Sequence, residues 1–236
     1  MAAMGTRGMF YKLVRQIPLG LARAYSLWAR KTYPFASVGE DLYLHYTCKL
    51  PCGAPRRIQL GNSVIICKDV WMNISCPSEE NDDPIIVLDD RSIIAPNCEL
   101  SAKNRIHLER GVMLSPNVLI MDHNHAYEDP NVPIRDQGVT GGGTIRIGEG
   151  TWIGHGASIV SSRRDLVIGR NCVVAANTMV HRSFPDYCVI AGSPARIVRQ
   201  FDPERGAWVP RMFRSARAKV ESYLIEEEIP VPLGTD

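Results

Sequence analysis

The chain has 236 residues, of which 45% are hydrophobic and 22% are charged, and its formal net charge is +2. This composition excludes disorder as the main state and a membrane-spanning helix, and it disfavours nucleic acid as a partner. Seven scattered cysteines without a Cys-x-x-Cys pair indicate neither a disulfide framework nor a zinc ribbon, and they favour a reducing cytoplasm.

Residues 1–37 are predicted to form a basic helical segment. Apolar side chains recur at three- and four-residue spacing between residues 9 and 33, which is typical of one or two amphipathic helices, with an interruption near Pro18-Leu19-Gly20. The first 39 residues contain no acidic residue and carry these basic ones: Arg7, Lys12, Arg15, Arg23, Arg30 and Lys31. We expect the segment to cap the following domain, and the alternative is peripheral contact with the anionic inner face of a membrane.

Residues 38–200 contain a six-residue repeat. Aliphatic residues spaced by six open its units in five triplets: Leu60, Ile66 and Met72; Leu88, Ile94 and Leu100; Leu108, Leu114 and Ile120; Ile147, Ile153 and Ile159; Ile168, Val174 and Val180. Small or branched residues follow four positions later in most units. A period of six matches neither a helix nor an alternating strand. It matches three short strands joined by corners in each turn of a coil, so we predict an all-β parallel solenoid.

Two segments interrupt this repeat. Residues 75–84 are polar and contain prolines, whereas residues 121–143 form a longer loop that includes His123, His125 and three successive glycines. A regular scaffold that extends a loop of about twenty residues usually uses it for function. The longer loop is therefore the first candidate for a functional site.

The C-terminal residues 201–236 lack the repeat and are predicted to be a helical extension. A helix is expected from Arg211 to Glu228, because Pro210 precedes this stretch and Pro230 follows it. We expect this helix to pack outside the coils.

Three motifs occur in a fixed order along the repeat: Met121-Asp122-His123-Asn124-His125, then Trp152-Ile153-Gly154, then Ala191-Gly192-Ser193-Pro194-Ala195-Arg196. With the six-residue units, they resemble the hexapeptide-repeat acyltransferases, in the branch of the maltose and galactoside O-acetyltransferases and their polysaccharide-modifying relatives. The resemblance implies a left-handed parallel β-helix and a homotrimer with active sites between neighbouring subunits. It implies a cytoplasmic enzyme that transfers an acetyl group from acetyl-CoA, without a metal, to a hydroxyl of a polysaccharide or glycolipid intermediate.

The chemistry of acetyl transfer requires a base, because a neutral hydroxyl is a weak nucleophile, and imidazole is the natural choice near neutral pH. The resemblance assigns this role to His125, whose second nitrogen Asp122, Glu128 or a backbone carbonyl could hold. His123 is the second catalytic candidate, and its spacing of two predicts that it shares a face with His125. Direct transfer in a ternary complex is expected, because no Ser-His-Asp or Cys-His nucleophile arrangement is visible.

The resemblance also implies the cofactor and acceptor contacts. Trp152 would flank the thioester, unless it packs at a subunit interface. The remaining positions expected to bind CoA are His155, Ala176, His181, Arg182, Arg196 and Arg199. Asn97 and Asp122 are predicted to bind the acceptor. Ala95 and Lys103 replace an asparagine and an aspartate of the sugar acetyltransferases, which favours a larger saccharide as the acceptor.

The sequence leaves three other functions open. An N-acetyltransferase that acts on an amino sugar would use the same site. A zinc hydratase similar to the β-helix carbonic anhydrases would need histidines such as His107, His123, His125 and His155, although their spacing does not match that family's ligands. The third alternative is a non-catalytic scaffold built from the same coils.

Overall fold

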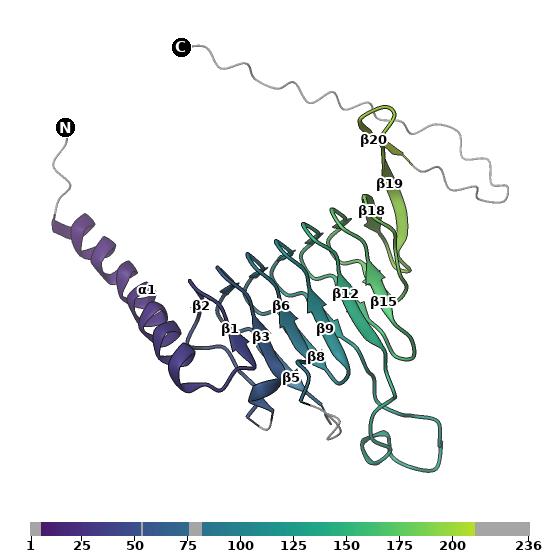
Figure 1. Cartoon of the computed structure of the whole chain (residues 1–236), viewed down its shortest axis with the longest axis horizontal. Coiled ribbons are helices and arrows are strands. Elements are labelled where there is room, and N and C mark those ends of the chain that lie inside the picture. The colour runs from purple at the N-terminus through teal and green to yellow at the C-terminus, as the bar shows by residue number, and fades with distance from the viewer. Residues whose placement is uncertain (1–5, 53, 76–81, 211–236) are drawn as a thin grey trace.

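The computed structural model describes residues 6–52, 54–75 and 82–210 (Figure 1). Short strands follow one another around three faces of a coil, and each strand pairs with the equivalent strand one turn further along the chain. The pairing is parallel along the whole coil and becomes antiparallel only at its C-terminal end. The structure is therefore mostly β with parallel sheets, as the six-residue period predicts.

Three sheets contain all the strands of the described residues. The first sheet consists of β1 (Ser37–Val38), β3 (Ile58–Leu60), β6 (Ile86–Leu88), β9 (Arg105–Leu108), β12 (Thr144–Ile147) and β15 (Leu166–Ile168). The second consists of β2 (Tyr43–Leu44), β4 (Ile65–Ile66), β7 (Ile93–Ile94), β10 (Met113–Leu114), β13 (Trp152–Ile153), β16 (Val173–Val174), β18 (Cys188–Ala191), β19 (Arg196–Asp202) and β20 (Ala207–Pro210). The third consists of β5 (Trp71–Ile74), β8 (Glu99–Ala102), β11 (Leu119–Met121), β14 (Ser158–Val160) and β17 (Met179–Val180). Two 3-10 helices, η1 (Pro55–Arg57) and η2 (Ile134–Asp136), lie in connections.

The core lies inside the coil and consists of the residues that the repeat predicts. Every member of the five aliphatic triplets is at most 2% exposed, and so is each small residue four positions later. Equivalent residues stack in register, as Ile66, Ile94 and Leu114 do in the second sheet. Each buried side chain therefore packs against its counterparts in the neighbouring turns, which removes apolar surface from water along the whole coil.

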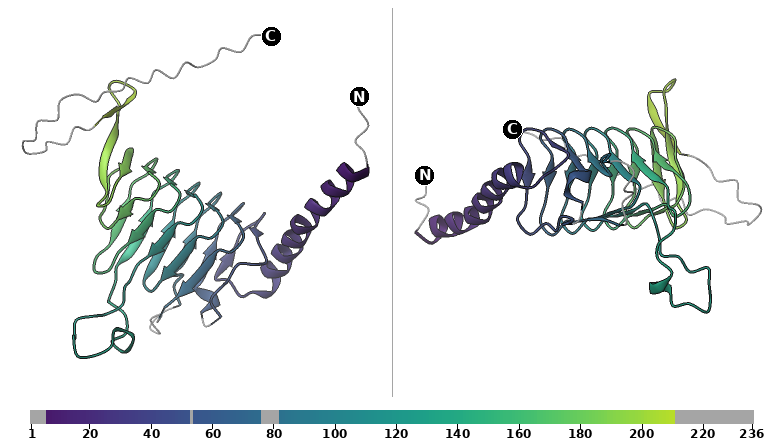
Figure 2. Two further views of the ribbon diagram at one scale, coloured as in Figure 1. Left: turned by 180° about the vertical axis from the view of Figure 1, so that it is seen from behind. Right: turned by 60° about the horizontal axis from the view of Figure 1, so that its bottom comes forward.

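Helix α1 (Thr6–Thr32) precedes the coils and extends beyond their N-terminal end (Figure 2). Its last turns pack on β2, where Ala22, Ser26 and Ala29 are at most 3% exposed. The Ser26 hydroxyl accepts a hydrogen bond of 2.8 Å from the Leu44 backbone N–H. The predicted interruption near residues 18–20 is wrong, because the helix continues through them. A proline removes one helical hydrogen bond, and the open space around Gly20 imposes no further break.

The chain reverses direction after the last coil. β18 pairs with β19 and β19 pairs with β20, both in antiparallel fashion, so residues 201–210 extend the second sheet instead of beginning the predicted helical extension. The rings of Phe201 and Trp208 pack edge to face with centroids 5.6 Å apart, and aromatic residues favour strands. The helix predicted from residue 211 to residue 228 lies outside the described residues.

Candidate active site

The loop between β11 and β12 leaves the coil through a two-stranded neck, which we define as residues 122–126 and 138–143. Backbone hydrogen bonds of 2.7 and 3.1 Å join its two legs on either side of a bridge between His125 and Val139. The neck therefore fixes the backbone of His125, although this residue is part of a long loop.

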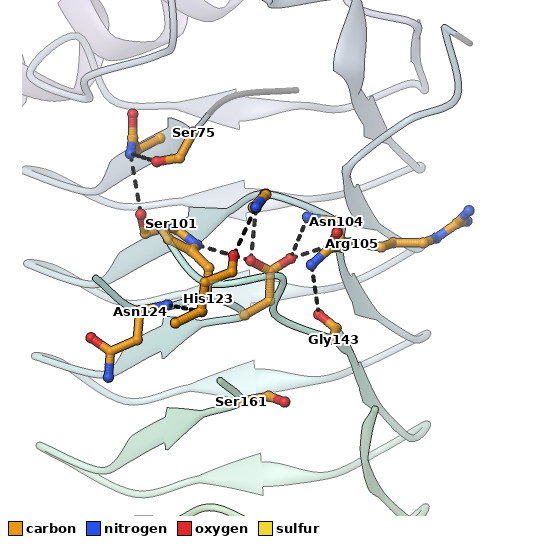
Figure 3. Close-up of polar contacts among 12 residues, drawn as sticks. Ser75, Ser101, Asn104, Arg105, His123, Asn124, Gly143 and Ser161 are labelled. Carbon is orange, nitrogen blue, oxygen red and sulfur yellow. Dashed lines mark hydrogen bonds and ion pairs between the residues drawn. The ribbon is translucent and has the colours of Figure 1, made fainter. Parts of the chain in front are cut away.

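Asp122 anchors the first leg of the neck. Its side chain is fully buried, and its carboxylate accepts hydrogen bonds of 2.7 to 2.8 Å from the backbone N–H groups of Lys103, Asn104 and Arg105 (Figure 3). The same carboxylate accepts a fourth hydrogen bond, of 3.0 Å, from Nδ1 of His123. The predicted role of Asp122 in acceptor binding does not fit this structure, because its oxygens are used inside the protein and are shielded from any ligand.

The second leg of the neck is held by two side chains from the turn before β9. Lys103 Nζ donates a hydrogen bond of 2.7 Å to the Thr140 carbonyl, and Asn104 Nδ2 donates one of 2.9 Å to the Gly141 carbonyl. Gly142 has a φ of +70°, and a side chain there would collide with the Asp122 carbonyl oxygen. Glycine is thus required where the leg passes closest to the coil.

The loop returns to the coil at the first residue of β12. Asp165 accepts hydrogen bonds from the Thr144 backbone N–H at 2.7 Å and from its hydroxyl at 2.9 Å. These two hydrogen bonds favour the ionised carboxylate and lower the pKa of Asp165. The return point therefore stays fixed at neutral pH.

The two loop imidazoles have opposite environments. His123 is 5% exposed, and its Nδ1 is held 3.0 Å from the Asp122 carboxylate, which fixes the orientation of the ring. His125 is exposed, and its ring forms no hydrogen bond with the residues that the structure describes. The spacing of two did not predict this difference in burial between His123 and His125. One imidazole is oriented and shielded, and the other is accessible to a ligand.

The tip of the loop projects away from the coils (Figure 1). The Gln137 amide nitrogen donates hydrogen bonds of 2.8 and 2.7 Å to the carbonyls of Asp129 and Val132, which closes the tip into a compact turn. Tyr127 and Ile134 are 60% and 55% exposed there. The tip thus presents apolar groups to its surroundings, on a backbone that is internally braced.

A second group of predicted residues lies on the second sheet and at the corner that leads to the third sheet. Trp152 is on the outer face of β13, in register with Met113, and its indole Nε1 donates a hydrogen bond of 2.8 Å to the Ser115 hydroxyl. His155 lies at the corner after β13, where its Nε2 is 3.3 Å from Nδ2 of Asn117. These contacts hold an exposed indole and an exposed imidazole side by side along one edge of the coil.

Asn97 and Ala176 occupy the same corner in other turns. Asn97 has a φ of +59°, and the equivalent Asn117 and Asn177 have φ values of +62° and +54°. Asparagine tolerates this left-handed conformation better than most residues, so a corner requirement explains Asn97 without a ligand. Ala176 is exposed and has a small side chain, which leaves open space beside the backbone at this corner.

The predicted cations lie at the C-terminal end of the coil. Arg182 and Arg196 both donate hydrogen bonds to the Ala195 carbonyl, at 3.2 and 3.0 Å, so their guanidinium groups converge. Neither forms an ion pair with a carboxylate in the part of the chain that the structure describes. Arg199 on β19 and His181 next to Arg182 are exposed. This cluster can bind an anionic group such as a phosphate.

One chain does not bring all these groups together. The histidine loop leaves at the edge between the third and first sheets, whereas Trp152, His155 and Ala176 lie along the second sheet and its edge with the third. The whole width of the third sheet separates the two edges, roughly 15 Å for five extended residues. In one chain the two groups therefore lie on different edges of the coil.

Several polar residues near the loop were not predicted. Ser101 on β8 is 5% exposed, and its hydroxyl accepts a hydrogen bond of 3.1 Å from Nδ2 of Asn73 on β5. These residues stand in register with Met121, two positions before His123. Lys103 was singled out only as a departure from related enzymes, yet it holds the neck. A polar residue at an outward position of the repeat is the sequence signal that could have identified Asn73 and Ser101.

Cys98, at the corner between the second and third sheets, is a poor nucleophile at neutral pH. The Cys98 thiol is buried at a corner 3.1 Å from the Ser115 carbonyl, and this burial raises its pKa to about 11. A thiol with that pKa supplies almost no thiolate, so Cys98 is no candidate for a nucleophile.

Within the described residues, no group of three or more His, Cys, Asp or Glu side chains is arranged to hold a metal ion. His107 does not join the loop histidines, because it lies on the first sheet and its Nε2 is 3.0 Å from the Asp89 carboxylate. No helix in the described part of the chain is both long enough and apolar enough to cross a bilayer.

Comparison with known proteins decides the family. No family model matches the sequence. A putative acetyltransferase from Dictyostelium discoideum is 30% identical over 166 residues, which cover 70% of this chain and 68% of that protein. The chain belongs to the hexapeptide-repeat acetyltransferase family. In the same family, the putative lipopolysaccharide biosynthesis O-acetyl transferase WbbJ from Escherichia coli is 27% identical over 131 residues, which cover 52% of this chain and 65% of WbbJ.

A solved structure shares the fold of this family member. AntD, an N-acyltransferase from Bacillus cereus in complex with dTDP and 3-hydroxybutyryl-CoA, superposes with a TM-score of 0.63 at 20% sequence identity. The match covers 77% of this chain and 91% of that one. The chain spans about half the length of several curated relatives that it matches, from 43% to 65%.

Proposed function

We propose that the protein is an acetyl-CoA-dependent O-acetyltransferase that transfers an acetyl group to a hydroxyl of a saccharide. The observation that carries the proposal is the histidine loop, in which a braced neck presents the accessible imidazole of His125 beside the buried Asp122–His123 pair. Membership of the acetyltransferase family fits the proposal. The parallel coil fits it as well, and we expect this coil to be left-handed, as in related enzymes.

In the proposed reaction, His125 is the general base. Its ring accepts the proton of the acceptor hydroxyl while the hydroxyl oxygen attacks the thioester carbonyl carbon. The tetrahedral oxyanion collapses with cleavage of the C–S bond, and the imidazolium returns the proton to the departing CoA thiolate. A backbone N–H at a coil corner is a suitable donor to the oxyanion. His123 would act as a positioning residue, because its 5% exposure leaves it little access to a substrate.

The second edge would bind the cofactor. AntD was solved with a CoA thioester, and the convergent guanidinium groups of Arg182 and Arg196 are suited to the phosphates of such a molecule. The exposed corner at His155 and Ala176 would hold the pantetheine arm, and the indole of Trp152 would shield the thioester from water. His181 and Arg199 would add positive charge around the phosphates.

The complete site would form between subunits of a homotrimer. Two sheets carry exposed apolar residues on their outer faces, namely Ile65, Met113 and Trp152 on the second and Trp71 and Met179 on the third. The first sheet instead carries polar pairs on its outer face, namely the hydrogen-bonded His107 and Asp89 and the ion pair of Arg146 with Glu109. This asymmetry supports an assembly in which the second and third sheets face neighbouring chains, and the loop tip reaches across.

The acceptor would be a polysaccharide or glycolipid intermediate instead of a simple galactoside. WbbJ is named for lipopolysaccharide biosynthesis, which supports a glycan acceptor. Lys103 is committed to the neck through the Thr140 carbonyl, so the position where sugar acetyltransferases have an aspartate is not available to a small sugar here. Asn97 at its corner would contact the acceptor from the neighbouring subunit.

The test is release of free thiol from acetyl-CoA in the presence of mono-, oligo- and lipid-linked saccharides. His125→Ala should lower kcat by about 100-fold or more, the usual contribution of a general base, without changing the melting temperature. His107→Ala is the matched control, because this imidazole lies on the first sheet, away from the loop. Activity of His125→Ala within twofold of the unmodified enzyme would refute the assigned base.

The second candidate is an N-acetyltransferase that acts on an amino sugar. AntD, which shares the fold, is an N-acyltransferase that was solved with a dTDP ligand. The same assay distinguishes the two reactions, because thiol release with amino sugars alone would replace O-acetylation by N-acetylation. Absence of thiol release with both classes of acceptor would favour the non-catalytic scaffold.

A further inference from the structure

The described part of helix α1 exposes an unusual number of large apolar side chains. Leu19, Leu21, Leu27 and Trp28 are 49%, 54%, 61% and 56% exposed, within fourteen residues of helix from Leu19 to Thr32. Leu21 and Trp28 are seven residues apart, so they lie on the same side of the helix two turns from each other. A soluble helix normally buries such a stripe.

The coils do not cover this stripe, because α1 packs on them through a different face. Ala22, Ser26 and Ala29 are the residues that face β2, and two of these three side chains are alanines. Leu21 and Trp28 are displaced by about 100° around the helix from Ala22 and Ala29, which directs them away from the first coil. The capping function that the sequence predicts therefore uses only the small residues of α1.

Unpaired cations flank the exposed apolar residues. Lys31 lies about 60° around the helix from Trp28, whereas Arg23 and Arg30 lie next to Leu27, about 160° from Leu21 and Trp28 and on the flank that faces the first coil. Arg23, Arg30 and Lys31 form no ion pair with any other residue that the structure describes. Arg23 and Arg30 line a groove of about 490 Å³ between α1 and the first coil, together with Leu27 and a single carboxylate, that of Asp41. No acidic residue precedes Glu40 in the sequence. The described end of α1, from Leu19 to Thr32, is thus positive as well as apolar on the sides that the coil does not cover.

We propose that α1 docks on the surface of an anionic lipid bilayer, with Leu21 and Trp28 inserted among the acyl chains near the headgroups and its cations paired with lipid phosphates. Charge complementarity favours this occupant, since an acid-free basic segment attracts anionic headgroups. Tryptophan and leucine beside arginine are the side chains that membrane interfaces favour. This inference does not depend on the proposed catalytic function.

The arrangement of the chain is compatible with docking during catalysis. α1 extends from the N-terminal end of the coil, and the histidine loop leaves the coil several turns further along (Figure 2). A bilayer that contacts α1 therefore leaves the loop free to receive an acceptor at the membrane surface. Docking would concentrate the enzyme where lipid-linked glycans are located.

The experiment is co-sedimentation of the full chain with vesicles of phosphatidylcholine, with and without phosphatidylglycerol. Binding should require phosphatidylglycerol and decrease as sodium chloride is added. Arg23→Gln/Arg30→Gln/Lys31→Gln should weaken partitioning by roughly fivefold for each cation removed. Leu21→Ser/Trp28→Ser should abolish binding, and brominated lipids should quench the fluorescence of Trp28.

The controls keep folding and assembly separate from lipid binding. Trp208→Ser removes an exposed aromatic residue at the opposite end of the coil, and Arg135→Gln removes an exposed cation from the loop tip, so neither should change partitioning. Light scattering measures the oligomeric state of every variant. Binding that is insensitive to the α1 substitutions overturns the proposal. The proposal is also overturned if the unmodified chain does not bind the vesicles and Leu21→Ser/Trp28→Ser forms a smaller assembly. That result would identify another copy of the chain as the occupant of this face.

Discussion

The coils and the histidine loop are stabilised in different ways. In the coils, equivalent aliphatic residues stack turn after turn, and parallel strand pairing repeats along each sheet. In the loop, the neck depends on one buried carboxylate, one lysine, one asparagine and a glycine that must adopt a positive φ. The position of a strand therefore depends on many equivalent contacts, whereas the geometry of the site depends on a few polar groups.

The largest expected effect on stability comes from the scaffold. Leu88 is fully buried in β6 on the first sheet, away from both edges that carry site residues. Leu88→Ala should lower the free energy of unfolding by about 2–5 kcal/mol, because it removes buried methyl groups and leaves a cavity. Activity per folded molecule, measured below the melting temperature, should be unchanged. A selective loss of kcat would contradict the independence of scaffold and site.

Removal of the carboxylate that anchors the neck should lower activity more than it lowers stability. Asp122→Ala leaves three backbone N–H groups and Nδ1 of His123 without their acceptor, at a cost of about 2–3 kcal/mol. kcat should fall by much more than the change in stability explains, because His123 and the His125 backbone lose their support. Asp136→Ala, in the exposed loop tip, is the control and should change neither quantity. Full activity of Asp122→Ala would show that the neck does not position the site.

The same contrast explains what the sequence could predict. The coil follows from a period of six, because each aliphatic residue at that spacing is buried by its own local repeat. The neck depends on pairs that are distant in sequence, such as Lys103 with Thr140, which are 37 residues apart. No periodicity reports such a pair. Asp122 was therefore predicted to face a ligand, whereas the structure buries it.

The C-terminal end shows a related limit. Residues 201–210 carry no six-residue signal, so the repeat appeared to end near residue 200. Their strand conformation comes from pairing with β18 and from aromatic contacts such as that of Phe201 with Trp208. Arg182 and Arg196 were predicted to bind CoA only because the resemblance to a family identified them, and this role stays a prediction. Their convergence on the Ala195 carbonyl is a feature of the fold that composition does not report.

A smaller effect on the free energy of unfolding is expected at two buried threonines. Thr151 and Thr178 occupy the same position of the six-residue repeat, and their substitution should have effects of opposite sign. The Thr151 hydroxyl donates to the Gly169 carbonyl at 2.8 Å and accepts from the Cys172 N–H at 3.0 Å, whereas the buried Thr178 hydroxyl has no partner among the described residues. Thr151→Val should destabilise by about 1–2 kcal/mol, and Thr178→Val should stabilise by about 1 kcal/mol. Chemical denaturation measures both. The same sign for the two substitutions would contradict the hydrogen-bond assignment.

The last expected effect is a loss of stability at alkaline pH, which arises in the coils and not in the loop. Burial raises the pKa of the thiols of Cys48, Cys98 and Cys172 to about 11, from an ordinary value of 9.0. The folded state therefore retains protons that the unfolded state loses, so stability is fully present below pH 9 and decreases as the pH rises towards 11. Replacement of Cys98 by alanine should flatten this decrease, whereas Cys52→Ser, which alters an exposed thiol, should not. An equal slope for the Cys98 variant and the unmodified protein would show that the Cys98 thiol does not control the alkaline limit. Ionisation of partly buried tyrosines such as Tyr33, whose pKa is also raised by burial, would then be the cause.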